Sequence, residues 1–259
     1  MRRLSVALVA IAFVLVTSPT VAQEDVPFTV VSEIGLAPED ANAFAEQVGI
    51  VAEAAAEIGL DARFAWNLYR WDNTFWFVGS ESTLANMEDP NAMAAQFMGT
   101  SVEDKVMAAF AAVGSMNVLS GNTEVLRVNP TLSYQPEAPQ IGDGSGGVFI
   151  VEEWVKGDSR DAWNESVADF MGVVREVGMP YPILVAEDII GDGNMSFVVI
   201  FDTLENFYGK NSFESLLADS PAAADMAEGQ AAHSKLIARS ASRHMMRLPA
   251  MSYQPDGGN

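Results

Sequence analysis

Hydrophobic residues recur at helical spacing in two stretches of the chain, 119 positions apart. In the first stretch they follow at intervals of four and three, which places them on one helical face: Phe44, Val48, Val51, Ala55 and Ile58. Adding 119 to each number gives a second set with the same spacing: Trp163, Val167, Phe170, Val174 and Val177. Gly59 and Gly178 follow these stretches, where a left-handed C-terminal cap is expected. The pattern predicts two equivalent helices.

Further segments repeat at nearly the same offset. "STLANM" at Ser82–Met87 corresponds to "DTLENF" at Asp202–Phe207, and "LSYQPE" at Leu132–Glu137 corresponds to "MSYQPD" at Met251–Asp256. Because such anchors follow in the same order in both halves, the pattern indicates a tandem duplication. We expect each hexapeptide to close its own half, with its tyrosine at the end of a fourth strand and its proline stopping further pairing.

Alternation and turn residues predict the same six elements in each half. In the first half these are a strand at 28–35, a helix to Ile58, two strands within 63–81 joined at Asp72-Asn73, a helical region at 91–115 broken near Gly99, and a strand within 123–136. The second half repeats them at 146–155, 161–177, 181–203, 213–239 and 244–255. The order β-α-β-β-α-β is that of a ferredoxin-like unit.

The chain divides into five predicted segments. The run at 1–22 has two arginines, an apolar stretch and small residues before Gln23, as in a secretory signal peptide. The other segments are a first repeat at 23–139, a glycine-rich linker at 140–147, a second repeat at 148–256 and a tail at 257–259. We therefore expect a periplasmic or secreted protein without a membrane span.

Two ferredoxin-like units leave one face of each sheet without helices, and such a face needs a cover. The element order and the duplication resemble the dimeric α+β barrel superfamily, although no family motif is matched. The resemblance implies an α+β fold in which the two tandem units form a barrel within one chain, as a pseudo-dimer. It also implies several alternative activities, since the superfamily includes cofactor-independent monooxygenases of quinol or antibiotic-biosynthesis type, haem-degrading monooxygenases and chlorite dismutase.

Composition narrows the possible partners. The formal net charge is −21 and there is no cysteine, so disulfides and cysteine-linked lipid anchors are excluded. Such an acidic surface repels nucleic acid and anionic lipid, so we expect neither as a partner.

Aromatic residues crowd one predicted hairpin of the first half. Alternation puts Phe64, Trp66 and Leu68 on one strand face and Asn67, Tyr69 and Trp71 on the other. One set should pack against helices, and the other should line the space between the sheets. Core packing and the binding of an apolar or aromatic ligand both explain this cluster. The ligand-binding candidates are Trp66, Tyr69, Trp71, Trp76, Trp154 and His233.

Acid–base candidates lie on the predicted strands. Glu33 on the first strand and Glu152 on its counterpart could act as bases if they face a shielded interior, and Asn67 could orient a substrate. Glu153 is the neighbouring alternative, and a solvated strand residue is the simpler interpretation of each.

The two histidines, His233 and His244, complete the candidates. His233 takes a place where the first half has valine, and it is either a hydrogen-bonded core residue or, through the resemblance, an axial haem ligand. His244 and Met246 share a strand face, and such side chains could be ligands of copper(I). The methionines are dispersed along the chain, however, and are better explained as core-filling residues, so no metal site is predicted. Lys235, Arg239 and Arg243 are expected toward the end of the last helix, where cations complement its dipole. Alternatively, they form a spot that attracts a carboxylate or phosphate ligand to an otherwise acidic surface.

Four functions remain open. The first is the binding of a small apolar or aromatic ligand between the sheets. The alternatives are a cofactor-independent monooxygenase using Glu33, Asn67 and Trp76, a haem-binding protein using His233, and a non-catalytic interaction module of the cell envelope.

Overall fold

The computed structural model describes residues 28–79, 92–141, 146–218 and 220–255. The predicted signal peptide, the tail, the repeat anchor Ser82–Met87 and part of the linker lie outside these ranges. Among the described helices, none has the length and apolar character that crossing a membrane requires. The described residues form two compact units: one contains those up to Val125 and those from Leu248 onward, and the other contains those between Leu126 and Arg247.

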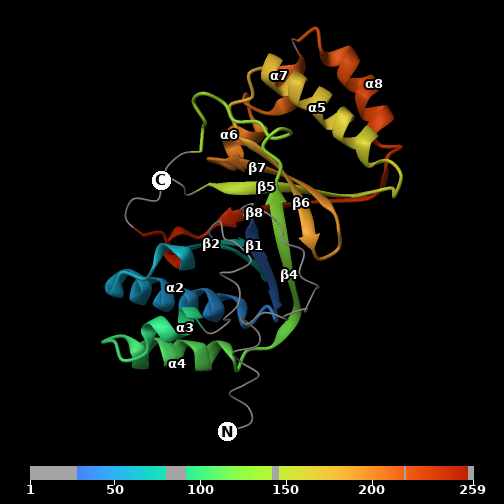
Figure 1. The fold of residues 1–259 in the computed structure, drawn as a ribbon. Coiled ribbons are helices and arrows are strands. Elements are labelled where there is room, and N and C mark those ends of the chain that lie inside the picture. Colours follow the sequence, from blue (N-terminus) through green and yellow to red (C-terminus); the bar gives the residue numbers. More distant parts are fainter. Residues whose placement is uncertain (1–27, 80–91, 142–145, 219, 256–259) are drawn as a thin grey trace. The chain divides into compact units, whose positions relative to one another are not determined.

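The first unit contains one sheet that carries helices on a single face (Figure 1). Its elements are β1 (Thr29–Leu36), α2 (Ala41–Ile58), a 3₁₀ turn (Ala62–Phe64), β2 (Trp66–Trp71), β3 (Thr74–Gly79), α3 (Ala92–Phe97), α4 (Glu103–Val113) and the beginning of β4 (Val118–Val128). Strand β3 pairs antiparallel with both β1 and β2, and the strand order is β4-β1-β3-β2.

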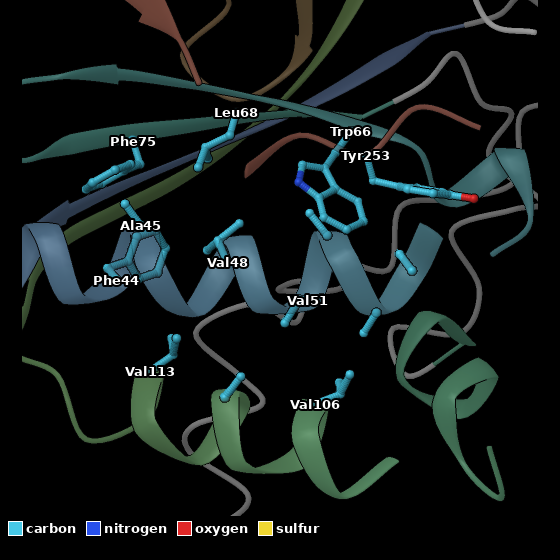
Figure 2. Close-up of a cluster of buried hydrophobic side chains, with 14 of the residues drawn as sticks. Phe44, Ala45, Val48, Val51, Trp66, Leu68, Phe75, Val106, Val113 and Tyr253 are labelled. Carbon is cyan, nitrogen blue, oxygen red and sulfur yellow. The ribbon is translucent and has the colours of Figure 1, made fainter. Parts of the chain in front are cut away.

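Helix α2 forms because its apolar positions recur on one face, as the sequence pattern predicts. Phe44 and Val48 point toward Leu68 and Phe75 of the sheet, and α4 packs against the other side of α2 (Figure 2). The helix ends at Gly59, whose φ of 60° allows the N–H of Leu60 to bond back to Ala55 O at 2.9 Å. Gly178 has a φ of 64° at the corresponding place, so both predicted glycine caps are confirmed.

The second unit repeats this arrangement. Its elements are β5 (Gly147–Val155), α5 (Arg160–Glu176), β6 (Ile183–Ile190), β7 (Met195–Phe201), α6 (Leu204–Tyr208), α7 (Phe213–Ala218), α8 (Ala223–His233) and β8 (Ile237–Arg247). Strand β5 pairs with β7 and β8, β7 pairs with β6, and the order is β8-β5-β7-β6. The α+β class and the ferredoxin-like order of strands in each unit are therefore confirmed.

The last helix is shorter than predicted. It ends at His233 and not near Arg239, because the following residues pair with β5, whose backbone groups need partners on both sides. Arg239 and Arg243 consequently lie on strand β8, and the prediction that they complement a helix dipole is wrong. Arg239 instead stacks over the ring of Trp154 at 3.6 Å.

Each of the two hexapeptides packs on the unit that is built mainly by the other half of the sequence. The long fourth strands end at Val128 and Arg247, before the hexapeptides begin, so the expected strand ends are wrong. Tyr134 belongs to the second unit, where it forms an isolated bridge with Ile183. Tyr253 belongs to the first unit, where it forms the same bridge with Trp66. Each half of the sequence therefore closes the unit that the other half builds.

Candidate functional site

The sheet of the first unit brings three candidate residues into one row. Glu33 on β1 is in register with Trp76 on β3, and Trp76 is in register with Tyr69 on β2. Since strand residues alternate, this row lies on the face opposite Leu68 and Phe75, which pack against the helices. We call the side that carries the row the helix-free face. Trp76 Nε1 donates a hydrogen bond of 2.7 Å to Glu33 Oε2, which fixes the carboxylate against the indole.

Asn67 and Trp71 extend this site on either side of the row. Asn67 pairs with Val78 and Trp71 pairs with Thr74, so both lie on the helix-free face. The side-chain oxygen of Asn67 is buried, and within the described part of the chain it accepts no hydrogen bond. A buried acceptor without a donor costs free energy, about 1–3 kcal/mol. Trp71 is 55% exposed at the hairpin, whereas Trp76 is only 4% exposed. The site thus runs from a buried indole to an exposed one.

Trp66 lies on the other face of the same strand. It packs in the helix-side core against the ring of Tyr253, with ring centroids 5.5 Å apart. Its Nε1 donates to Met251 O at 2.8 Å. These contacts make it a packing residue, and we leave it out of the candidate site.

Glu152 holds the place in the second unit that Glu33 holds in the first. Both lie on the first strand of their unit and on its helix-free face, but Glu152 is paired with Arg243 of β8 at 2.6 Å between Oε2 and Nη2. The carboxylate side chain is 6% exposed. Trp154 lies on the same face, beneath Arg239. The second helix-free face is therefore organised around the guanidinium groups of Arg243 and Arg239, whereas the first carries the row of Glu33, Trp76 and Tyr69.

His233 is a bridge between helices and sheet in the second unit. Its Nδ1 lies 2.9 Å from Ser166 Oγ on α5, and its Nε2 lies 2.9 Å from Glu153 Oε2 on β5. The same carboxylate oxygen accepts a 2.7 Å bond from Trp163 Nε1. Because both ring nitrogens are engaged, binding haem iron would first require breaking one of these bonds. The arrangement favours the hydrogen-bonded core histidine over the axial ligand.

His244 lies in an aromatic cluster on the helix side of the second unit. Its ring stacks on Phe149 with centroids 4.5 Å apart, and it bonds to the hydroxyl of Tyr208. Burial lowers the pKa of His244, because it disfavours the charged imidazolium. Over the described ranges no group of three His, Cys, Asp or Glu side chains could hold a metal ion.

Several residues that bind these side chains could not be recognised from the sequence. The four-residue spacing predicts a place near the end of a helix for Arg243, so it gives no indication of the pairing with Glu152. Glu187 was not singled out, yet it binds two arginines, Arg127 and Arg160, each at 2.8 Å. Burial alone would raise the pKa of Glu187, but the hydrogen bonds and charges of both arginines outweigh it and lower that pKa. Ser166 carried no signal at all, because a serine in a helix is ordinary.

Comparison with known proteins identifies the fold. No protein-family model and no curated protein sequence matches the chain. Among solved structures, a provisionally assigned monooxygenase from Fusobacterium nucleatum matches with a TM-score of 0.58 and 9% identity, over 92% of this chain and 98% of that one. A provisionally assigned monooxygenase from Lactobacillus acidophilus matches with a TM-score of 0.54 and 9% identity, over 89% and 97%. An anthrone oxidase-like protein matches with a TM-score of 0.52 and 11% identity, over 93% and 98%. At the level of the fold, the resemblance to monooxygenase-type ferredoxin-like proteins is confirmed.

Proposed function

We propose that the protein binds a small aromatic ligand on the helix-free face of the first unit. The observation that carries this proposal is the row of Glu33, Trp76 and Tyr69, flanked by a buried amide oxygen that lacks a hydrogen-bond donor among the described residues. The half-buried phenol of Tyr69 and the exposed indole of Trp71 offer flat apolar surface to a ligand ring. The carboxylate and the amide oxygen are both acceptors, so the matching ligand carries hydroxyl or N–H groups on its ring.

The amide oxygen of Asn67 gives the sharpest test of this site. Thermal shift and native mass spectrometry across a panel of quinols, anthrones and simple phenols should identify at least one ligand with 1:1 stoichiometry. Asn67→Ala should weaken the binding of that ligand by about two- to tenfold, because one hydrogen bond to a buried acceptor is worth about 0.5–1.5 kcal/mol. Thr74→Ala, on the same face opposite Trp71, is the matched control. A panel without any binder would count against the proposal.

A second candidate function is a cofactor-independent monooxygenase. The fold likeness to provisionally assigned monooxygenases and to an anthrone oxidase-like protein supports it, and Glu33 supplies a carboxylate beside two aromatic rings. In this reaction Glu33 takes a proton from an acidic C–H or O–H of the substrate. The resulting electron-rich anion reduces dioxygen, of which one atom enters the product and the other leaves as water.

Oxygen uptake separates this enzyme from a simple binding protein. With an anthrone as substrate, one dioxygen should be consumed for each quinone formed, without added metal or flavin. Glu33→Gln should lower the rate at least 100-fold, as loss of a general base does, while Glu53→Gln, at an exposed carboxylate of α2, should leave the rate within about twofold. If no panel member raises oxygen uptake above the buffer rate, binding without catalysis is the remaining function.

We further propose that the protein is exported, on the basis of the arginines and apolar run at 1–22. N-terminal sequencing of the protein recovered from the producing cells should begin at Gln23. A mature chain that still begins at Met1 would contradict export through this leader.

A further inference from the structure

The segment from Leu248 to Pro255, which we call the closing segment, is held on the first unit by main-chain and side-chain bonds. Tyr253 exchanges two backbone hydrogen bonds of 2.9 Å with Trp66 on β2. Its hydroxyl donates to Leu60 O at the end of α2, and its side chain is 4% exposed. Ser252 Oγ accepts a 2.9 Å bond from the N–H of Leu68. We call this receiving surface of Leu60, Trp66 and Leu68 the closing groove.

The second unit holds residues 129–136 in the same way. Tyr134 exchanges backbone bonds of 2.8 and 2.9 Å with Ile183, and its hydroxyl donates to Met179 O at 2.7 Å. Ser133 Oγ accepts a 2.9 Å bond from the N–H of Val185. Met179 and Leu60 both follow the glycine that ends a helix. The same recognition pattern therefore occurs twice: in each case the groove binds a Ser-Tyr pair that directly follows a turn, which is a 3₁₀ turn at Pro249–Met251 in the closing segment.

The polar groups that are recognised are few and mostly belong to the backbone, and Met251 and Tyr253 of the closing segment also pack against the apolar core of the first unit. Each groove offers a strand edge, a helix-end carbonyl and one N–H for the serine oxygen, which is peptide recognition by strand addition. Nothing in this pattern depends on the segment being covalently joined to the groove. The boundary between the two compact units falls between Arg247 and Leu248, where β8 ends. The closing segment can therefore leave its groove without breaking a β8 pair with β5.

We infer that the closing groove also accepts the closing segment of a second copy of this chain, so that two copies exchange their C-terminal segments. Exchange makes the same bonds in the partner that each copy makes within itself, which is the condition for a domain-swapped dimer. Within one copy the tethered segment competes at an effective concentration of about millimolar. The exchanged form therefore becomes populated at high protein concentration or when the copy's own segment is weakened.

A labelled peptide tests the groove in the full-length chain. The probe is a fluorescein-labelled dodecapeptide with the sequence of residues 248–259, followed by fluorescence anisotropy. The double variant Ser252→Ala/Tyr253→Ala should bind it saturably, and the wild type should bind it at least tenfold more weakly, because its own segment competes. A peptide with Phe in place of the tyrosine should bind about fivefold more weakly. An unlabelled peptide of residues 129–140 should displace the probe, since it carries the same Ser-Tyr pair.

Energy transfer tests exchange without weakening the segment. The chain contains no cysteine, so Asn259→Cys permits a single donor or acceptor label on otherwise unaltered protein. Donor and acceptor copies mixed at high concentration should develop energy transfer slowly, and a tenfold excess of the free dodecapeptide should suppress it. A folded double variant that does not bind the probe would overturn the inference. So would energy transfer that is absent, or that the peptide leaves unchanged.

Discussion

The helix-free faces of the two units start from the same fold and the same glutamate position but are organised differently. In the first unit Glu33 accepts a bond from the indole of Trp76, in a row that also contains Tyr69. In the second unit Glu152 is buried against the guanidinium of Arg243. A carboxylate satisfied by a strong ion pair is a structural element, whereas one that lies among aromatic rings can meet a ligand. This difference is our reason for placing the proposed ligand site on the first unit.

The largest effect is expected from breaking the ion pair of the second unit. Arg243→Ala leaves the carboxylate of Glu152 buried without that cation, and removal of one partner from a buried pair costs about 3–5 kcal/mol. Urea unfolding should show a loss in this range. Lys105→Ala, which removes an exposed pair with Glu53 at 3.1 Å, should change stability by less than about 1 kcal/mol. Equal losses in both variants would contradict the structural role of Glu152.

Next in size is the comparison of the two indole–carboxylate bonds. Trp163→Phe removes the donor to Glu153 in the fully buried core of the second unit, and Trp76→Phe removes the donor to Glu33. A hydrogen bond to a charged group is worth about 1.5–3 kcal/mol, so the first substitution should lie near the upper end and the second near the lower. Thermal unfolding of both variants measures the difference. A larger loss for Trp76→Phe would contradict the assignment of Trp76 to a ligand-binding face.

The exchanged tyrosines should behave alike. Tyr134→Phe and Tyr253→Phe each remove one hydroxyl bond to a helix-end carbonyl, to Met179 O and to Leu60 O. Each should cost about 1 kcal/mol, and the double variant should show the sum, because the two tyrosines belong to different units. A cost confined to one tyrosine would show that the two grooves are not equivalent.

The smallest expected effect concerns pH and belongs to the second unit. Burial lowers the pKa of His244 in the folded state below its ordinary value of 6.5. The unfolded chain therefore binds this proton more readily, and stability falls as pH drops below about 6.5 through the folded pKa. His244→Gln should flatten the dependence of unfolding free energy on pH between about 7 and 5. A slope that persists unchanged in the variant would assign it to other groups.

Much of the fold can be predicted from the spacing of apolar residues and glycines that are close together in the sequence. Helical spacing around Phe44 and Trp163 and the glycines after each stretch predict the paired helices, and alternation separates Leu68 from Tyr69 on β2. The repeated order of elements then leads to the ferredoxin-like arrangement. These features depend on neighbours in sequence, so the sequence alone reveals them.

The features that the sequence did not reveal depend on partners distant along the chain. The strand assignment of Arg239 and Arg243 comes from pairing with β5, which overrides a four-residue spacing typical of a helix. The exchange of the hexapeptides comes from which groove each tyrosine reaches, and the repeat itself favours neither choice. The bonds of His233 to Ser166 and Glu153 join residues 67 and 80 positions apart. No local pattern encodes such contacts.

The assignment of function to the first unit is tested most directly by ligand affinity in two matched tryptophan variants. The strongest binder of the aromatic panel should be titrated by calorimetry into the wild type, Trp76→Leu and Trp154→Leu. We expect Trp76→Leu to weaken binding more than tenfold, because it removes the indole that holds the Glu33 carboxylate in the row. Trp154→Leu should leave affinity within about twofold, since that ring lies under Arg239 in the other unit. Loss of affinity in Trp154→Leu with retention in Trp76→Leu would contradict a ligand site on the first unit.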